Sequence, residues 1–217
     1  KVGPLKEFTM TDKDRYELKI AGLLHDCGKI TTPVHVVDKA TKLEKIFDRI
    51  ELIQTRAEIV LRDFQIAALN NLITEEMAMK RHQQLIDDFN FLSHCNIGVE
   101  SMYDSDIARV HTIAKDYQWE DISGRVHSFL SGDEIQNLTI RAGTLTAQER
   151  HIINHHIDTT IAMLEKLPWP KHLKNVPEYA GGHHERMDGK GYPRGLTRDA
   201  DLVTPWLTDW RGRYTGA

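Results

Sequence analysis

The sequence has few of the features that mark secreted, membrane-spanning or nucleic-acid-binding proteins. Its 217 residues include only two cysteines, Cys27 and Cys95, which are too few for a disulfide framework. No apolar run in it approaches the ~20 residues that a membrane span needs. A formal net charge of −4 gives no general electrostatic reason to bind duplex nucleic acid. We therefore expect a cytoplasmic globular domain, although a membrane-anchored parent is not excluded.

What the sequence does contain is two short polar motifs that lie far apart. The first is His25-Asp26-Cys27-Gly28-Lys29. Adjacent residues on a helix point about 100° apart, so a His-Asp pair can contact neighbouring ions or let its carboxylate bridge two of them. Lys29 falls one turn after His25, where its ammonium can reach an anion held at a metal. Cys27 points to another face and is expected to be a small core residue.

The second motif reads His-His-Glu-Arg-Met-Asp-Gly-Lys-Gly-Tyr-Pro, from His183 to Pro193. Because the two adjacent histidines are followed by Glu-x-x-Asp-Gly-x-Gly-Tyr-Pro, we expect His183 and His184 to be metal ligands. We expect Glu185 and Asp188 to orient these ligands through hydrogen bonds rather than to bind metal themselves.

The end of this motif is typical of a shaped loop. Gly189 and Gly191 are expected to supply positive φ angles, and Tyr192-Pro193 is expected to stiffen the chain. Loop architecture is the favoured role of these four residues. Docking of a partner, or shaping of a substrate mouth, is the alternative.

Together the motifs resemble those of the HD-GYP family, a subset of the HD phosphohydrolase superfamily. The matching sequence includes Leu23 to Ile30, Leu145 to Arg150 leading to His156, and His183 to Pro193. The resemblance implies an all-α fold, a centre of two or three metal ions, and hydrolysis of cyclic di-GMP to linear pGpG or further to GMP. It also implies that Asp26 and Lys29 take part in catalysis.

The resemblance further implies a ligand set. One ion would have four ligands from this chain: Asp26, His156, His183 and His184. A second ion would take His25 and the shared Asp26, together with an upstream histidine and a downstream aspartate that the sequence does not show; Asp201 and Asp209 are the substitutes considered for the latter. We expect two divalent ions in the intact parent, with iron or manganese favoured over nickel or zinc. This chain is expected to bind at most one ion tightly and to be weakly active or inactive.

His25 and His156 are further apart than in the family, which suggests a long insertion. We expect residues 1–40 and 137–197 to form the HD-GYP core, residues 41–136 to form a helical insertion, and residues 198–217 to form an atypical tail. Apolar residues at alternating steps of three and four from Leu43 to Ala67 predict one helix, and Thr74 to Leu92 a second one that returns as a hairpin. A structural arm is favoured; a homodimerisation or signal-receiving element is the alternative.

Four further helices are predicted. The first begins near Thr11-Asp12 and ends at Gly28 to Ile30, and another spans Asp104 to Ala114. A third spans Thr146 to Leu167, with His156 directed inward and His155 into solvent. A fourth starts at Pro177 and runs to His184.

The sequence therefore predicts a metal-dependent phosphodiesterase of cyclic di-GMP. One alternative is an inert regulatory module whose Gly-Tyr-Pro loop docks a diguanylate cyclase. The other is a different HD-type nucleotide phosphohydrolase.

Overall fold

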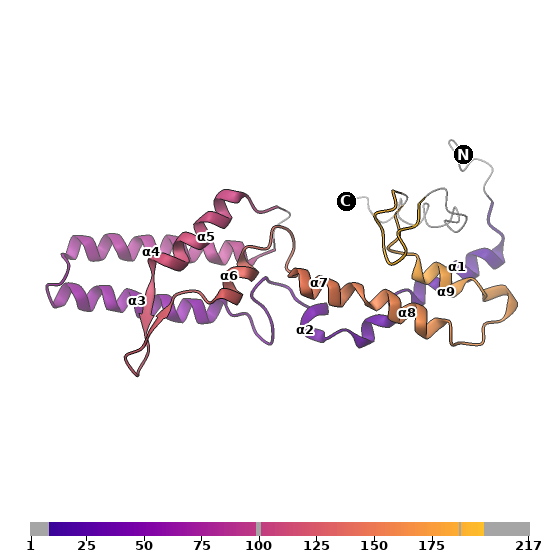
Figure 1. The fold of residues 1–217 in the computed structure, drawn as a ribbon, viewed down its shortest axis with the longest axis horizontal. Helices are drawn as coiled ribbons and strands as arrows, with labels where there is room; N and C mark the ends of the chain where they lie inside the picture. Colours follow the sequence, from indigo (N-terminus) through magenta and orange to yellow (C-terminus); the bar gives the residue numbers. More distant parts are fainter. Residues whose placement is uncertain (1–8, 99–100, 187, 198–217) are drawn as a thin grey trace. The chain divides into compact units, whose positions relative to one another are not determined.

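The computed structural model describes residues 9–98, 101–186 and 188–197, and this part of the chain is mostly helical (Figure 1). It divides into two compact units. Unit 1 comprises the described parts of Lys1–Pro33 and His151–Ala217, and unit 2 comprises those of Val34–Arg150. The predicted all-α class is confirmed, apart from one small sheet. Within the described residues, no helix has both the length and the apolar character that a membrane crossing requires.

Unit 1 is built from short helices around a small apolar core. Its elements are α1 (Asp12–Leu24), the 3-10 helix η1 (Cys27–Thr31), the end of α7 (Ala147–Asn154), α8 (His156–Leu164), the 3-10 helix η2 (Lys171–Leu173) and α9 (Val176–Gly181). Four buried residues form the core: Ala21, Leu164, Val176 and Ala180. Cys27 packs against this core, as predicted.

Helix α1 begins where the sequence predicts but ends earlier. The Thr11 hydroxyl accepts a hydrogen bond from the Asp14 amide, and the Asp14 carboxylate accepts one from the Thr11 amide. The predicted end at Gly28 to Ile30 is wrong, because α1 stops at Leu24 and a 3-10 turn follows. The amide of Gly28, which would bond to Leu24 in a continuous α-helix, donates instead to the side chain of Thr160.

Two other predicted helices also end early, in each case near a histidine. The predicted helix from Thr146 to Leu167 is divided into α7 and α8, with His155 at the junction. Helix α9 ends at Gly181, so the second-motif histidines lie in the turn after it and not within it.

Unit 2 contains the predicted helical hairpin. Its elements are α2 (Val34–Val37), α3 (Ile50–Leu69), α4 (Glu75–Asn96), α5 (Asp104–Asp116), β1 (Gln118–Glu120), β2 (Val126–Ser128), α6 (Gly132–Leu138) and the start of α7. Helices α3 and α4 lie side by side and are joined by a short connection (Figure 1). The core includes Ile53 on α3 and Leu85 and Leu92 on α4, all fully buried.

The heptad prediction placed the start of α3 too early. Residues 41–49 form bridges and turns, and α3 starts at Ile50. Within this irregular segment Leu43 is fully buried, whereas Ile46 is 96% exposed. Helix α4 begins next to Thr74, the predicted start of the second helix, and the Thr74 hydroxyl caps it by accepting from the Met77 amide. Helix α5 also starts at its predicted residue, Asp104.

The small sheet was not predicted. Strands β1 and β2 pair antiparallel, and Trp119 stacks on its cross-strand partner His127. Their turn is organised by Asp121, whose carboxylate accepts from the Ser123 and Arg125 amides and contacts the His127 ring. Asx-type bonding of this kind stabilises a turn without a helical pattern.

The units divide the chain at Pro33 and Arg150, outside the predicted limits of the insertion at residues 41 and 136. The boundary at Arg150 lies within α7. The assignment of residues 41–136 as an insertion into a family core stays a prediction. The predicted tail, with Asp201 and Asp209, lies outside the described residues.

Candidate metal centre

The candidate centre lies in unit 1 and is built on three histidines within two residues of a helix end. His25 directly follows α1, His156 starts α8 two residues after the end of α7, and His183 comes two residues after the end of α9. Each ring uses Nδ1 to bond the carbonyl oxygen three residues earlier: that of Gly22 at 2.7 Å, that of Ala180 at 2.6 Å, and that of Ile153.

These hydrogen bonds fix the tautomer of all three rings. A carbonyl oxygen only accepts, so each Nδ1 carries the proton and donates it. In the neutral ring the lone pair is then on Nε2, which is the arrangement of a metal-ligating histidine whose other nitrogen is held by the backbone. The same bonds occupy carbonyls at helix ends, which otherwise lack an intrahelical partner.

Asp26 lies among the Nε2 atoms of these rings. Its Oδ1 atom is 3.2 Å from Nε2 of His156 and 3.6 Å from Nε2 of His183. Its Oδ2 atom is 3.2 Å from Nε2 of His25 and 2.7 Å from Nζ of Lys29. The two carboxylate oxygens therefore face different histidines, which is the disposition that a bridging carboxylate needs.

Burial keeps His183 in its metal-binding form. His183 is 8% exposed, and burial lowers its pKa to about 4 even though the bond to Ala180 opposes the shift. It is therefore neutral at pH 7. Burial raises the pKa of Asp26, but the hydrogen bond from Lys29 and the positive charges nearby outweigh this and hold that pKa below its ordinary value.

The donor atoms of this cluster fit a cation. Within the described residues, Asp26 Oδ1 and His156 Nε2 are buried atoms that make no hydrogen bond. Both carry lone pairs, since the ring proton of His156 is on Nδ1, and they lie 3.2 Å apart. Two buried electron-pair donors that face each other are costly unless a positive charge satisfies both. A divalent metal ion would do so.

His184 completes a second group of ligand atoms. The nitrogens of His156, His183 and His184 lie within 4.8 Å of one another, and so do the ligand atoms of His25, Asp26 and His183. His183 belongs to both groups. The His184 ring also stacks on Tyr192, with centroids 4.6 Å apart and planes inclined by 14°. The structure thus brings together the five residues that the sequence nominated as ligands, while their individual roles stay predictions.

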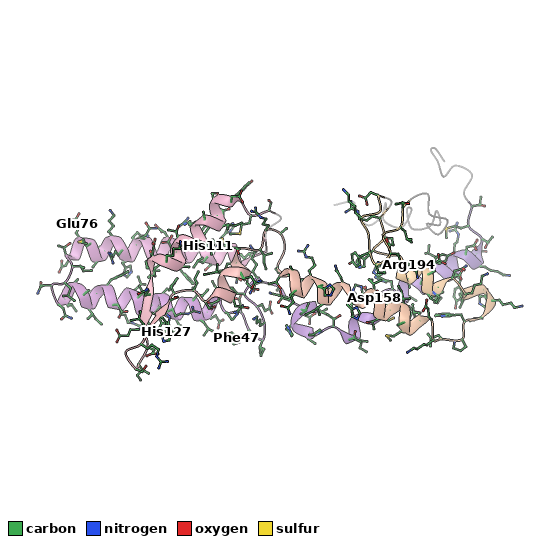
Figure 2. The ribbon with its side chains drawn as sticks, in the orientation of Figure 1. Phe47, Glu76, His111, His127, Asp158 and Arg194 are labelled. Carbon is green, nitrogen blue, oxygen red and sulfur yellow. The ribbon has the colours of Figure 1, made fainter. Side chains whose placement is uncertain are left out.

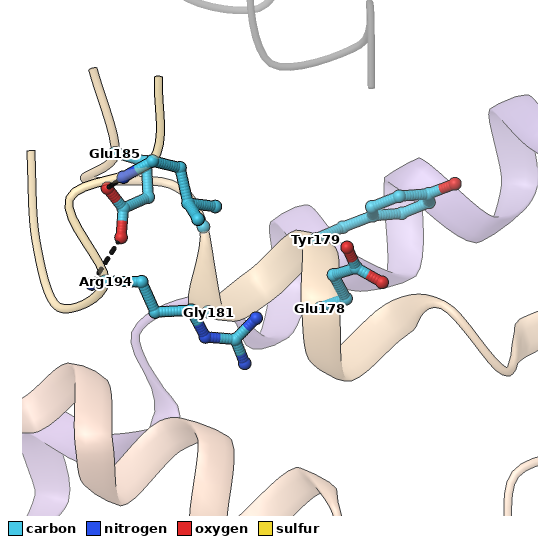
Figure 3. Close-up of a pocket in the computed structure, with 7 residues that line it drawn as sticks. Glu178, Tyr179, Gly181, Glu185 and Arg194 are labelled. Carbon is cyan, nitrogen blue, oxygen red and sulfur yellow. Dashed lines mark hydrogen bonds between the residues drawn. The ribbon is translucent and has the colours of Figure 1, made fainter. Parts of the chain in front are cut away.

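The carboxylates of the second motif hold the loop. Glu185 is buried and accepts from the amides of Arg194 at 2.6 Å and Leu196 at 2.8 Å. Figure 3 shows its carboxylate turned toward the loop backbone, beside a pocket that Arg194 also lines. Asp188 bonds to the Arg186 side chain and to the Lys190 amide. The two carboxylates thus satisfy backbone amides of the loop, which lie outside any helix or strand. The sequence predicts a different role for them, the orientation of the ligands.

The two loop glycines serve different purposes. Gly189 has a φ of 72°, as predicted. Gly191 does not have a positive φ, so that prediction is wrong. A Cβ atom on Gly191 would lie 2.2 Å from the Arg186 amide nitrogen and 2.4 Å from Cα of Glu185, so glycine is required there by close backbone approach. The Tyr192-Pro193 peptide is cis.

The neighbouring histidines on α7 and α8 are solvent-facing. His151 and His155 are exposed, as predicted for His155. His155 bonds to Asp158, an exposed residue of α8 that is labelled in Figure 2. Among the described residues, neither histidine belongs to a group that could hold a metal ion. Thr160 faces inward on α8 and accepts from the Gly28 amide of the first motif, a contact that no local pattern in the sequence predicts.

Comparisons with known proteins agree with this geometry. Two family models, both described as HD domain, match residues 5–89 and 128–200. The 3'3'-cGAMP-specific phosphodiesterase 3 of Vibrio cholerae is 36% identical to the chain over 69 residues, which cover 31% of this chain and 14% of that protein. No solved structure matches the chain. The matched segments contain both motifs and the histidines that meet at Asp26, and on these grounds the chain contains an HD domain.

Proposed function

We propose that this HD domain is of the HD-GYP type and hydrolyses a phosphodiester bond of a cyclic dinucleotide, with cyclic di-GMP as the first candidate. The observation that carries the proposal is the position of Asp26. Its two oxygens face His25 on one side and His156 and His183 on the other, with Lys29 beside them.

Divalent metal ions would be held by two groups of side chains. One group is His156, His183 and His184 with Oδ1 of Asp26, and the other is His25 with Oδ2 of Asp26. When bound, the ions supply a low pKa for coordinated water and positive charge to stabilise the phosphoryl oxygens in the transition state. Imidazole-rich sites with a carboxylate favour iron or manganese here, with nickel and zinc as alternatives.

The side chains of the protein contribute position and charge. Lys29 is 38% exposed at its side chain, so it is accessible to a phosphate while its ammonium stays 2.7 Å from Asp26. We assign it to hold a phosphoryl oxygen or the leaving oxygen of the substrate. The backbone bonds of His25, His156 and His183 keep the rings from turning, so their Nε2 atoms stay directed at Asp26.

A second candidate substrate comes from the comparison. The Vibrio cholerae relative is named for 3'3'-cGAMP, a cyclic dinucleotide that differs from cyclic di-GMP in one base. A centre that acts on the phosphodiester does not by itself distinguish the two. Base contacts outside the centre would decide between them.

The test is hydrolysis by the purified protein after loading with Mn²⁺ under reducing conditions. Cyclic di-GMP, 3'3'-cGAMP and linear pGpG are offered separately, with a chelated sample beside each. We expect a cyclic dinucleotide to be consumed slowly, because this chain provides few ligands for a second ion. This activity should fall at least ~100-fold in Asp26→Ala, because charge stabilisation worth several kcal/mol is lost. Asp158→Ala is the matched control, since it removes an exposed carboxylate from α8. Cleavage of linear nucleotides alone would contradict the proposal.

A further inference from the structure

A single buried hydroxyl joins the first motif to the helix that carries His156. Thr160 on α8 is fully buried. Its Oγ1 atom accepts a hydrogen bond from the Gly28 amide at 3.0 Å and donates one to the His25 carbonyl at 3.3 Å. These two backbone groups lie on either side of Asp26 in the sequence, so the hydroxyl holds the turn that presents this carboxylate.

The same contact leaves little space between the two elements. A Cβ atom on Gly28 would lie 2.1 Å from the carbonyl oxygen of His156 and 2.7 Å from the amide nitrogen of Thr160. The backbone of η1 is therefore in direct contact with the first turn of α8. Gly28 permits this close approach of the two backbones. The two hydrogen bonds of the Thr160 hydroxyl then fix the position of η1 relative to α8.

The joint matters because each element carries part of the candidate centre. His25 and Asp26 come from the turn between α1 and η1, and His156 comes from the start of α8. The 3.2 Å separation of Asp26 Oδ1 from His156 Nε2 depends on how these elements are placed. Metal ligands must be held within about 0.5 Å of their working geometry by the residues behind them.

We propose that Thr160 is a positioning residue, which sets Asp26 against His156 and thereby the affinity of the centre for a metal ion. This inference rests on the proposed function, from which the expected metal ion comes. It assigns the effect to the hydroxyl and not to the methyl group. If Thr160 served only in packing, loss of its methyl group would weaken metal binding and loss of its hydroxyl would not.

The test compares three variants by the affinity of the purified protein for Co²⁺, measured by calorimetry and by chelator competition. Thr160→Val keeps the shape and removes both hydrogen bonds, whereas Thr160→Ser keeps the hydroxyl and removes the methyl. Thr159→Val is the matched control, because within the described part of the chain the Thr159 hydroxyl bonds to the carbonyl of His155, in its own helix region, and to no other group. We expect Thr160→Val to weaken Co²⁺ binding about 10–100-fold, and the other two to stay within about threefold of the unaltered protein.

Two results would overturn the inference: Co²⁺ affinity unchanged in Thr160→Val, or affinity lost equally in Thr160→Ser. Amide exchange at Gly28 in the unaltered, metal-free protein gives a readout that does not depend on the valine variant folding. We expect that amide to be protected, and exchange at the rate of an open loop would also overturn the inference. If the unaltered protein binds Co²⁺ but cleaves no cyclic dinucleotide when loaded with Mn²⁺, the proposed function fails and the comparison of affinities still decides the role of Thr160.

Discussion

Each of three histidines in the candidate centre has two roles. Its Nδ1 atom satisfies a carbonyl oxygen at or near the end of a helix, and its Nε2 atom points at Asp26. One side chain therefore satisfies a carbonyl near a helix end and provides a candidate ligand atom. The helices that end close to His25, His156 and His183 are all shorter than the sequence predicts.

Tyr192 gives a residue-scale prediction, because its ring stacks on the ring of His184 at 4.6 Å. Tyr192→Phe keeps an aromatic face and should leave Co²⁺ affinity within about threefold, whereas Tyr192→Leu should weaken it about tenfold, the lower end of the effect of ligand-supporting residues. Calorimetry with Co²⁺ measures both. Equal affinities in the phenylalanine and leucine variants would show that the stacking does not position His184.

At the scale of elements, the hairpin of α3 and α4 has its own core within unit 2. Ile53→Asp should disrupt this core, because the residue is fully buried, while leaving Co²⁺ binding by the histidines of unit 1 within about threefold. Burying a carboxylate without a partner costs several kcal/mol. Limited proteolysis of the hairpin and calorimetry with Co²⁺ measure the two effects.

Leu52→Asp is the control for this prediction, because Leu52 is the preceding residue on α3 and is 44% exposed. It should leave both proteolysis and metal binding unchanged. If Ile53→Asp lost metal binding and Leu52→Asp did not, the hairpin and the histidine centre would not fold separately. Replacing both Ile50 and Ile53 would be a less sharp test, since Ile50 is only partly buried.

The contact between α6 and α3 predicts a dependence on pH. Glu134 is 3% exposed and pairs with Arg56 through distances of 2.5 and 3.0 Å. Burial raises the pKa of Glu134, but the bonds from Arg56 and Ser131 outweigh it and hold that pKa below 4.5. The folded state therefore binds the proton less tightly than the unfolded state. The resulting stability is present above pH 4.5 and is lost as the pH falls through the lower pKa of the folded protein.

Urea unfolding at pH 7 and pH 3 tests this dependence. Glu134→Gln should lower the free energy of unfolding by about 3 kcal/mol at pH 7, because it leaves Arg56 without its charge partner. The difference between the two proteins should shrink toward pH 3. Glu58→Gln, which alters an exposed pair on α3, should have little effect at either pH. A difference for Glu134→Gln that is the same at both pH values would exclude the charge as its origin.

At the scale of the whole molecule, the candidate ligands all belong to unit 1, so metal binding should stabilise the two units unequally. Co²⁺ at 100 times its dissociation constant should add about 2.7 kcal/mol to the stability of unit 1. Hydrogen exchange measured by mass spectrometry, with and without Co²⁺, resolves this by peptide. Peptides from residues 12–31 and 156–181 should gain protection and those from residues 50–138 should not.

His156→Gln is the control for that measurement, since it removes a ligand and should abolish the gain in protection. Equal gains in peptides from both units would contradict the prediction. They would show that the two units respond to the metal as one cooperative structure.

The sequence by itself determined the helical class, the hairpin in unit 2 and the residues of the candidate centre. Apolar spacing is a local property, and so are caps such as Thr11 and Thr74, which is why these features are readable without coordinates. The two polar motifs were recognisable because each is a short run of contiguous residues. Even so, they carried no information on which atoms face one another.

Only the tertiary structure decided where the helices end and what surrounds Asp26. Helix α1 stops because the Gly28 amide bonds to Thr160, which lies 132 positions away in the sequence. Gly191 needs no positive φ, and its constraint is the backbone of Arg186 and Glu185 packed against it. Such contacts join segments that no local pattern relates, so the predicted ends of α1, α9 and the helix containing His156 lie past the observed ones. The same contacts bring Oδ1 of Asp26 within 3.2 Å of His156, and that juxtaposition is what makes the cluster a candidate for metal chemistry.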